Sequence, residues 1–600
     1  MNSSASSNET PPGRPLLVFD GDCTFCRTWI GYWKQLTGDA ITYAPYQEAA
    51  AKIPEVPRED FQRAVQLILP GGERFSGAHA VFRSLAAVPG YAWLLWAYHR
   101  VPGFAALTEW VYRQIAAHRS FAYGVTLFLW GKHPEPATHE ITVRWFMWSL
   151  GLIYLIAFLS LEVQITGLIG AHGILPAERF LAAVRENYGA SAWLHVPTLF
   201  LFGTSDAMLR LTCVVGAIAS LAIIVGYARR LALATAFVLY LSLVHAGQSF
   251  LSFQWDFLLL ESGFLAMFLR PALPRVWLFR WLLFRLMLLS GAAKLLSHDP
   301  TWRNLTALRY HYETQPLPTI FAWYFHHLPP AFQRISCGFM FFAELVVPFL
   351  FFTPRRVRFF AAAITIALQV LIFITGNYTF FNLLAMALCL LLYDDAAFRR
   401  GQVAGARRGP TQRAVSIALS AFILSASGLQ LLETFSGSIP DPAAVMLSDI
   451  APFGVVNTYG LFAVMTTSRP EIIVEGSNDG QTWREYSFRY KPGDLRRAPV
   501  WVQPYQPRLD WQMWFAALGN YRADPWFVNF AVRLLEGSPD VLALMGQNPF
   551  PSGAPRYIRA RLYEYRFTTA AERNATGNWW TRELKGEYLP GVSLRGAPAE

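Results

Sequence analysis

Nine apolar stretches between residues 143 and 433 dominate the hydrophobic pattern of the chain. A helix needs about 20 apolar residues to cross the core of a bilayer, and most of the stretches approach this length. Two are shorter, so a tilted, re-entrant or wrongly divided segment remains an alternative there. The stretches are residues 143–163, 209–227, 231–249, 255–270, 276–297, 333–353, 357–375, 379–393 and 415–432. The pattern predicts a multi-span α-helical membrane bundle over residues 143–433.

The pattern changes on both sides of this bundle. Before it, short apolar runs alternate with helix-like segments, which predicts a small α/β domain at residues 15–135. After it, residues 557–568 alternate between apolar and polar positions, and two alternating runs flank an Asn-Asp-Gly turn at residues 478–480. We therefore predict a β-rich, sandwich-like domain at residues 434–600. Residues 1–14 are polar and proline-rich, without the apolar segment of a signal peptide, and we predict a disordered tail.

The composition agrees with a membrane protein, because 54% of the residues are hydrophobic and the chain has 46 Phe and 21 Trp. The net charge of +11 could indicate nucleic-acid binding. However, the arginines cluster in alternate loops between the apolar stretches, as the positive-inside rule predicts for a protein surrounded by membrane lipid. These loop arginines are Arg229, Arg230, Arg270, Arg275, Arg355, Arg356, Arg358, Arg399, Arg400, Arg407, Arg408 and Arg413.

The same loops predict an orientation and argue against a nucleic-acid partner. All of the arginine-rich loops fall on one side if the N-terminus is cytoplasmic. Nine spans then place the C-terminal domain on the outer side of the membrane. We expect a bacterial inner membrane or, in a eukaryotic cell, the endoplasmic reticulum membrane.

Cys23 and Cys26 form the most informative motif of the N-terminal domain. They follow Asp20 and Gly21 at the end of an apolar run, so we expect a strand, a tight turn and a helix that begins at the cysteines. The unpaired N–H groups and the dipole at a helix N-terminus favour the thiolate form of a cysteine. Half of a zinc site remains an alternative, but no second CxxC or spaced histidine pair lies nearby.

We therefore favour a redox pair, in which Cys23 attacks a disulfide and Cys26 resolves the mixed disulfide. Asp20 is a third candidate for this catalytic site. We predict no metal and no cofactor.

Five ionisable residues within the apolar stretches are candidates for a polar cluster in the membrane: Asp256, Glu261, Arg285, Lys294 and Glu344. Charges inside a bilayer are costly, so each needs a partner or a function. We expect Glu261 to pair with Lys294 or Arg285, and Glu344 to pair with an arginine. Two interpretations remain open, namely ion pairs that stabilise the bundle and a catalytic or transport site.

Two aromatic segments are candidates for binding a client protein. The loop at residues 298–334 has histidines whose spacing fits no standard metal site, and we expect it to form a packed lid on the membrane surface. The segment at residues 507–519 is amphipathic, and a docking surface, core packing and a helix resting on the membrane are all open alternatives. The candidate client-binding residues are His311, Tyr312, Glu313, Trp511, Trp514 and Phe515.

The sequence DGDCTFC at residues 20–26 resembles the opening motif of the DCC family of thioredoxin-like thiol-disulfide oxidoreductases. The segments SGAHAVFRSL and VYRQIAAHR, around His79 and from Tyr112 to Arg119, are also similar to that family. This resemblance implies a thioredoxin-like fold and redox activity. Because we expect a cytoplasmic N-terminus, the implied partner is a cytoplasmic thiol and the implied role is that of a reductase.

Three further segments resemble the lipase maturation factor family: TWRNLTALRYHYETQPLP at residues 301–318, GNYTFFNLLA at residues 376–385 and DWQMWFAAL at residues 510–518. The resemblance implies a membrane chaperone that helps exported lipase-like clients reach their active form. More remotely, the helical core is similar to that of the vitamin K-dependent γ-carboxylases, which keeps a membrane enzyme as an alternative. A membrane-anchored protein-disulfide reductase is a third hypothesis.

Overall fold

The computed structural model describes residues 13–54, 56–88, 90–132, 134–269, 273–398 and 410–594, which form two compact units. The first unit is Met1–Thr138, Pro354–Val357 and Ala396–Gln402, and the second is His139–Thr353, Arg358–Asp395 and Val403–Glu600. Most of the predicted tail lies outside the described residues, and so do some of the loop arginines. These are Arg270, Arg399, Arg400, Arg407 and Arg408, whereas only the backbone of Arg275 and Arg413 is described.

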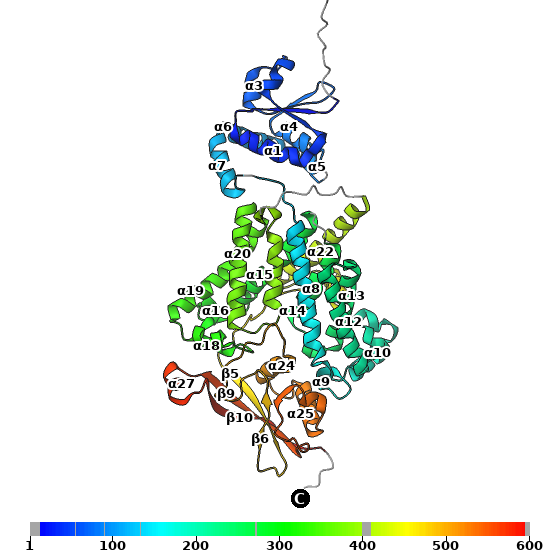
Figure 1. Ribbon diagram of the computed structural model, residues 1–600, viewed down its shortest axis with the longest axis vertical. Coiled ribbons are helices and arrows are strands. Elements are labelled where there is room, and N and C mark those ends of the chain that lie inside the picture. Colours follow the sequence, from blue (N-terminus) through cyan, green and yellow to red (C-terminus); the bar gives the residue numbers. More distant parts are fainter. Residues whose placement is uncertain are drawn as a thin grey trace, which may run out of the picture. The chain divides into compact units, whose positions relative to one another are not determined.

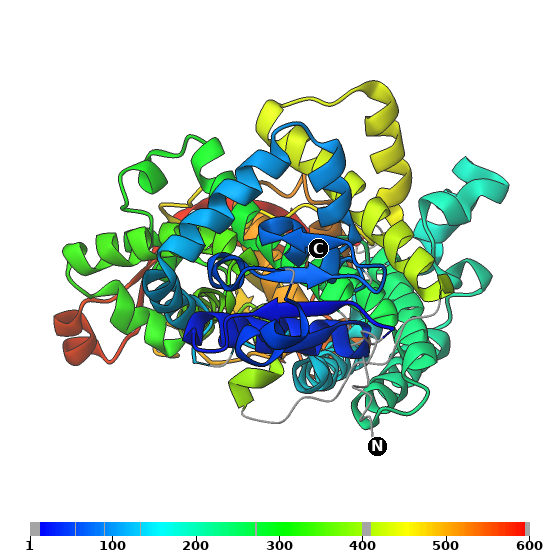
Figure 2. The same ribbon diagram turned by 90° about the horizontal axis from the view of Figure 1, so that it is seen from above.

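A four-stranded sheet in the order β2-β1-β3-β4 lies at the centre of the first unit (Figures 1 and 2). Strand β1 pairs in parallel with β2 and antiparallel with β3, which pairs antiparallel with β4. The strands are β1 Leu16–Phe19, β2 Thr42–Pro45, β3 Gln66–Ile68 and β4 Arg74–Ser76. The α/β fold predicted for this part of the chain is confirmed.

Helices cover both faces of this sheet because successive strand residues point to opposite sides. Leu17 packs in a cluster with Ile30 of α1 and Ala80 of α4, whereas Val18 packs with Phe61 of α3. The helices of the first unit are α1 Thr24–Thr37, α2 Tyr46–Ala49, α3 Arg58–Arg63, α4 Gly77–Leu85, α5 Ala92–Arg100, α6 Phe104–Ala117 and α7 Arg119–Leu129.

In the described part of the chain, seven helices are long and apolar enough to cross a membrane. They are α8 Glu140–Glu162, α12 Asp206–Val225, α13 Arg229–Ala246, α15 Leu273–Leu296, α19 Pro330–Phe341 with its continuation to Phe352, α20 Arg355–Thr375 and α22 Pro410–Ser436. The continuation of α19 is a π-helical turn, Phe342–Val346, followed by a 3₁₀ segment, Val347–Phe352. The multi-span helical class predicted from the sequence is confirmed.

Two of the nine apolar stretches form helices shorter than the other seven, and the predicted count of about nine spans stays a prediction. The shorter helices are α14 (Gln254–Phe268) and α21 (Phe381–Cys389). The 15 residues of α14 extend about 22 Å at 1.5 Å per residue, against about 30 Å for the hydrocarbon core. Both helices are largely buried within the second unit.

Short helices connect the long ones. The loop predicted as a lid at residues 298–334 contains α16, α17 and α18 and leads into α19. The connecting helices are α9 Ile165–Ile169, α10 Ala177–Tyr188, α11 Ala192–His195, α16 Pro300–Arg303, α17 Leu308–Thr314 and α18 Ile320–His326.

The C-terminal residues form a four-stranded antiparallel sheet in the order β10-β9-β5-β6 and a two-stranded sheet of β7 and β8. The predicted hairpin around residues 478–480 is the β5–β6 pair, in which Glu475 lies opposite Glu485. The strands are β5 Arg469–Ser477, β6 Arg484–Glu485, β7 Ser487–Phe488, β8 Met545–Gln547, β9 Tyr557–Phe567 and β10 Trp580–Val592. The antiparallel strands predicted for this part of the chain are thus confirmed.

These strands and their helices pack against the membrane helices within one compact unit. Figure 1 shows the larger sheet at one end of the helical bundle, with α24 between the two. The boundary of a separate domain at residue 434 stays a prediction. The remaining helices are α23 Asp441–Ile450, α24 Arg508–Ala517, α25 Pro525–Leu535, α26 Pro539–Leu542 and α27 Ala570–Thr576.

Candidate functional site

The two cysteines of the first unit lie at the N-terminus of α1. Cys23 is the N-cap residue, and its Sγ accepts a hydrogen bond from the backbone N–H of Cys26 at 3.2 Å. The two sulfur atoms are 2.7 Å apart, and both thiols are free and half-buried. A Cβ atom on Gly21 would lie 2.7 Å from Cβ of Pro45, so the turn before the cysteines needs glycine. This geometry suits a dithiol that exchanges with a disulfide.

Asp20 lies beside this pair and forms an ion pair. Its Oδ2 is 3.0 Å from Nη1 of Arg119, and its Oδ1 accepts the backbone N–H of Asp22 at 3.1 Å. Cys26 lines a small cavity of about 50 Å³ together with Asp20 and Arg119. Burial, followed by the hydrogen bond with Cys23, raises the pKa of Cys26 to about 12. The thiol of Cys26 therefore stays protonated near neutral pH, which suits the resolving role predicted for it.

The first buried ion pair of the helical bundle joins Glu261 of α14 and Arg285 of α15. Both side chains are essentially inaccessible to solvent. Glu261 also accepts hydrogen bonds from the hydroxyl of Tyr459 at 2.7 Å and from the backbone N–H of Asn457 at 3.0 Å. Arg285 in turn donates to the backbone oxygen of Asn457 at 3.0 Å. Of the two partners predicted for Glu261, the structure thus selects Arg285.

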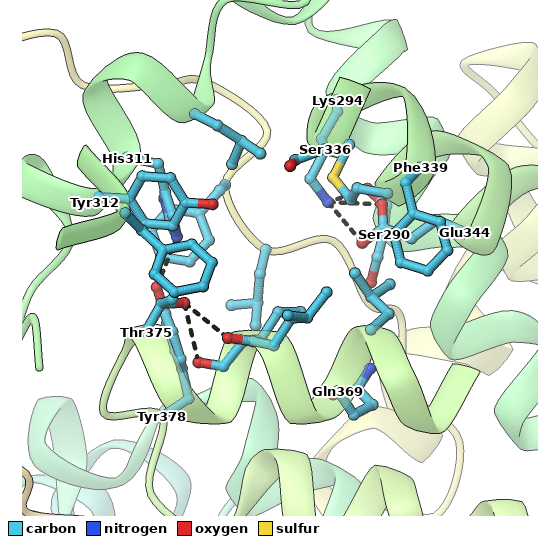
Figure 3. A pocket seen from close by; sticks show the side chains of 18 of the residues that line it. Ser290, Lys294, His311, Tyr312, Ser336, Phe339, Glu344, Gln369, Thr375 and Tyr378 are labelled. Atoms are coloured by element: carbon cyan, nitrogen blue, oxygen red, sulfur yellow. Dashed lines mark hydrogen bonds and ion pairs between the residues drawn. The ribbon is translucent and has the colours of Figure 1, made fainter. Parts of the chain in front are cut away.

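The second pair joins Lys294 of α15 and Glu344 of the π-helical turn, with Nζ 2.9 Å from Oε2 (Figure 3). Lys294 also donates to the backbone oxygen of Ser290 at 3.0 Å. The expectation that Glu344 pairs with an arginine is therefore wrong. A Cβ atom on Gly291 would lie 2.7 Å from Leu345, so this glycine allows α15 and the π-helical turn to approach closely. That approach places Glu344 against Lys294.

The third pair joins Asp256 of α14 and Arg508 of α24. The two guanidinium nitrogens lie 2.8 and 2.9 Å from the two carboxylate oxygens, and both residues are fully buried. Asp256 also accepts the hydroxyl hydrogen of Tyr240 at 2.5 Å, and Arg508 donates to the backbone oxygen of Phe250 at 2.6 Å. This bidentate pair links the C-terminal residues to the interior of the helical bundle.

The HYETQP, GNYTFF and DWQMW segments, which lie far apart in the sequence, meet in the second unit. The hydroxyl of Tyr378 donates to Oε1 of Gln315 at 2.9 Å. The indole N–H of Trp514 donates to the backbone oxygen of Thr314 at 2.8 Å. The rings of Tyr378 and Trp511 are 5.9 Å apart between centroids. The three segments therefore form one packed junction between α17, α21 and α24.

Two polar side chains fix the backbone at this junction. Arg469 of β5 donates to the backbone oxygen of Pro316 at 2.9 Å and pairs with Glu471 at 2.8 Å. Asn377 donates from Nδ2 to the backbone oxygen of Val500 at 2.8 Å. These bonds tie the C-terminal residues to the connections between the membrane helices, because backbone groups buried at such connections need partners.

The candidate client-binding residues are distributed unequally between surface and interior. Trp511, Trp514 and Tyr312 are buried, whereas Phe515 is 43% exposed. Trp511 packs edge-on against Trp255, with centroids 4.9 Å apart. Of the three aromatic candidates on α24, which are Trp511, Trp514 and Phe515, Phe515 alone therefore offers a large apolar surface. Its role in binding a client stays a prediction.

Glu313 and His311 occupy different surroundings on α17. Glu313 lies 3.5 Å from Nε2 of His326 and accepts the backbone N–H of Phe567 at 3.1 Å. Burial raises the pKa of Glu313 to about 7, although its backbone hydrogen bond acts in the opposite direction. Nε2 of His311 lies 3.2 Å from the hydroxyl oxygen of Tyr378. Glu313 thus belongs to the contact with β9, and His311 belongs to the junction.

Sequence reasoning missed Arg508, Arg469 and Asn377. One signal was available for Arg508, because Asp256 had no predicted partner and Arg508 lies in the amphipathic segment at residues 507–519. Arg469 and Asn377 bind backbone oxygens, a role that leaves no pattern in the sequence. Among the described residues, no group of three or more His, Cys, Asp or Glu side chains is placed to hold a metal ion.

Comparison with known proteins identifies relatives that match about three-quarters of the chain. Lipase maturation factor 2 of Gallus gallus is 38% identical over 581 residues, an alignment that covers 75% of this chain and 81% of the relative. The chain belongs to the lipase maturation factor family. Lipase maturation factor 1 of Bos taurus is 37% identical over 503 residues, and the alignment covers 89% of that relative. Lipase maturation factor 2 of Homo sapiens is 35% identical over 584 residues and is covered to 82%.

Sequence models of three families match separate parts of the chain. The lipase maturation factor transmembrane domain matches residues 141–400, and the lipase maturation factor C-terminal domain matches residues 455–590. The DCC1-like thiol-disulfide oxidoreductase family matches residues 17–125. The predicted resemblances to the lipase maturation factor family and to the DCC family are confirmed, and the chain is an integral membrane protein. No solved structure matches the chain.

Proposed function

We propose that this membrane protein assists the maturation of an exported lipase-like client. The observation that carries the proposal is the similarity to proteins named lipase maturation factor over more than four-fifths of their length. The similarity also includes the segments that form the junction of α17, α21 and α24. It favours this function over a carboxylase-like membrane enzyme, to which the chain showed only a remote resemblance.

The proposed orientation has a cytoplasmic N-terminus and an outer C-terminal sheet, in a bacterial inner membrane. It is supported by the arginine-rich loops, all of which fall on one side when the nine apolar stretches all cross the membrane. A client could then reach Phe515 after its export. Leu518, at the C-terminal end of the same helix, is also 43% exposed and adds to the apolar surface around Phe515.

The test is to delete the gene in its host and to measure the specific activity of each secreted lipase against the amount of lipase protein. We expect lipase protein to be exported with reduced specific activity, and wild-type protein supplied from a plasmid to restore it. A Phe515→Asp variant should restore less activity than a Phe515→Leu variant. A secreted non-lipase hydrolase serves as the control and should be unaffected. Normal specific activity of every lipase after deletion would contradict the proposal.

We infer a second function for the first unit, thiol-disulfide exchange with a cytoplasmic thiol partner. Cys23 as thiolate attacks a partner disulfide, forms a mixed disulfide and releases one partner thiolate. Cys26 then passes its proton to the released partner thiolate, attacks Sγ of Cys23 and displaces the second partner sulfur as a thiolate. The products are a Cys23–Cys26 disulfide and a reduced partner. A cytoplasmic dithiol must reduce the pair again before the next cycle.

An apolar groove beside the cysteines supports a polypeptide as this partner. The groove has a volume of about 850 Å³, and Phe25, Trp29 and Trp130 are among its lining residues. A Cys26→Ser variant should trap partners as mixed disulfides, because its resolving thiol is missing. A Cys23→Ser variant should trap none. Equal trapping by both variants would refute the assignment of the two cysteines, and it would leave the lipase proposal untouched.

A further inference from the structure

One face of α5, in the first unit, is both aromatic and exposed. Trp93 is 58% exposed and Trp96 is 63% exposed. Their spacing of three residues places both side chains on the same side of the helix. Arg100 follows four residues later on that side and is also exposed. We call Trp93, Trp96 and Arg100 the outer face of α5.

The other side of α5 packs inside the first unit and fixes the rotation of the helix about its axis. Ala97 is buried, and the ring of Tyr98 lies 6.0 Å from the ring of Phe82 of α4 between centroids. The hydroxyl of Tyr98 donates a hydrogen bond to Oε1 of Glu109 of α6 at 3.1 Å. Because these contacts hold one side of the helix inward, the outer face is a fixed feature of the fold.

The composition of the outer face is that of a helix at the surface of a bilayer. Large apolar side chains that lie together on an exposed surface mark interaction sites. Tryptophan is enriched at the level of the lipid head groups, where its ring has apolar surroundings and its N–H group meets water. Helices that lie in this layer combine such aromatic residues with arginine or lysine. Two tryptophans and one arginine on one side of α5 fit this description.

The charge around α5 favours an anionic partner. Residues 91–132, which contain α5, α6 and α7, include Glu109 as their one acidic residue. Its carboxylate is turned inward, where it accepts the backbone N–H groups of Ala78 at 3.3 Å and of His79 at 3.0 Å. Arg100, by contrast, has no acidic partner within the part of the chain that the structure describes. Its charge therefore remains available to anionic head groups.

The chain that follows the first unit keeps this unit within reach of a bilayer. Helix α7 ends at Leu129, and α8, which is long and apolar enough to cross a membrane, begins at Glu140. The ten residues between these two helices extend over at most about 36 Å. A covalent link this short gives the lipid surface a high effective concentration at the first unit. Lipid is therefore the partner that the outer face of α5 always has available.

We propose that the first unit binds an anionic lipid surface through the outer face of α5. Trp93 and Trp96 enter the head-group layer, and Arg100 contacts lipid phosphates. None of these three residues lines the small cavity at Cys26 or the groove beside the cysteines, so this binding leaves both sites unoccupied. The proposal goes beyond the functions proposed above and depends on neither the client nor the dithiol.

The test places a photoreactive amino acid at position 96 of the full-length protein in lipid nanodiscs. One set of nanodiscs contains phosphatidylcholine mixed with anionic phosphatidylglycerol, and the other contains phosphatidylcholine alone. After illumination, mass spectrometry measures the adducts between protein and lipid. The control position is Glu59, which is exposed on α3. Helices α3 and α5 lie on opposite sides of the sheet, because Phe61 packs with Val18 and Leu94 packs with Leu17 (Figure 1).

We expect lipid adducts at position 96 in the mixed nanodiscs and none at position 59. One arginine near an anionic membrane surface strengthens binding about fivefold. Arg100→Gln should therefore lower the ratio of bound to unbound first unit, read from the adduct yield, about fivefold in the mixed nanodiscs. The same variant should have no effect in phosphatidylcholine alone. Arg58→Gln, the same change at an exposed position of α3, is the matched control and should leave the yield unchanged.

Trp93→Gln should reduce the lipid adducts at position 96, whereas Trp93→Phe, which keeps an apolar ring, should retain most of them. If Trp93→Gln lowers the melting temperature, Arg100→Gln takes its place. Absence of lipid adducts at position 96, or an equal yield at position 59, overturns the proposal. Adducts between two copies of the chain in place of lipid adducts also overturn it. Equal yields in the two kinds of nanodisc overturn the requirement for anionic lipid.

Discussion

The pair between Asp256 and Arg508 leads to a specific prediction about the stability of the second unit. We consider Arg508→Met, which keeps most of the side-chain volume and removes the charge. Arg508 makes two hydrogen bonds to Asp256 and one to the backbone oxygen of Phe250. The substitution leaves the carboxylate of Asp256 buried between α13 and α24 with the hydroxyl of Tyr240 as its remaining partner among these contacts.

The magnitude follows from the number of bonds and from the buried charge. Hydrogen bonds to charged groups contribute about 1.5–3 kcal/mol each, and removal of one partner of a buried ion pair costs about 3–5 kcal/mol in total. We therefore expect Arg508→Met to lower the free energy of unfolding by about 3–5 kcal/mol. The double variant Asp256→Leu with Arg508→Met removes the uncompensated charge as well, and it should recover about 2 kcal/mol of that loss.

The assay is the fraction of soluble, monodisperse protein in detergent after heating, combined with limited proteolysis of the C-terminal sheet. Arg508→Met should melt earlier and release the C-terminal residues first, because it removes one of the buried links between these residues and the bundle. Arg496→Met, the same change at an exposed position, is the control and should melt like wild type. Wild-type stability of Arg508→Met, or a double variant less stable than the single one, would refute the reasoning.

Three further predictions concern other sites. Burial raises the pKa of Cys26 to about 12, so iodoacetamide at pH 7 should alkylate Cys23 and spare Cys26 in the reduced protein. Preferential alkylation of Cys26 would contradict the resolving role assigned to it. Lys294→Met should destabilise the protein by about 3–5 kcal/mol because it leaves Glu344 buried alone, and a Lys294→Met, Glu344→Gln double variant should melt higher than the single variant. Burial raises the pKa of Glu313 from its ordinary value to about 7, so its contribution to stability is present at acidic pH and is lost as the pH rises to 7. Glu313→Gln should therefore melt increasingly above wild type between pH 5 and pH 8, and a difference that shrinks over this interval would contradict the assignment.

Much of the local structure was predictable because it follows from periodicity. The alternation at residues 557–568 predicted β9, and the Asn-Asp-Gly turn predicted the β5–β6 hairpin. Strand β10 was not predicted, because its run of exposed polar residues and Gly586 interrupt the alternation of apolar and polar positions. In the structure, its pairing with β9 has several register shifts.

Pairing between distant residues was less predictable than local structure. The sequence predicted Lys294 or Arg285 as the partner of Glu261, but it gave no information on which helices are in contact. The partner of Lys294 was decided by close packing at Gly291, and the partner of Asp256 came from a helix more than 250 positions away in the sequence. The CxxC pair was found because its chemistry is local, since both cysteines lie in one turn of one helix.

The most direct test of the proposed maturation function uses a photoreactive amino acid placed at single positions of the chain. Phe515 is an exposed aromatic side chain of α24, and Trp96 is an exposed aromatic side chain of the first unit. We predict that the crosslinker at position 515 captures a newly exported lipase in living cells, and that the crosslinker at position 96 does not. Absence of a lipase adduct at position 515, or an equal adduct at position 96, would contradict the account.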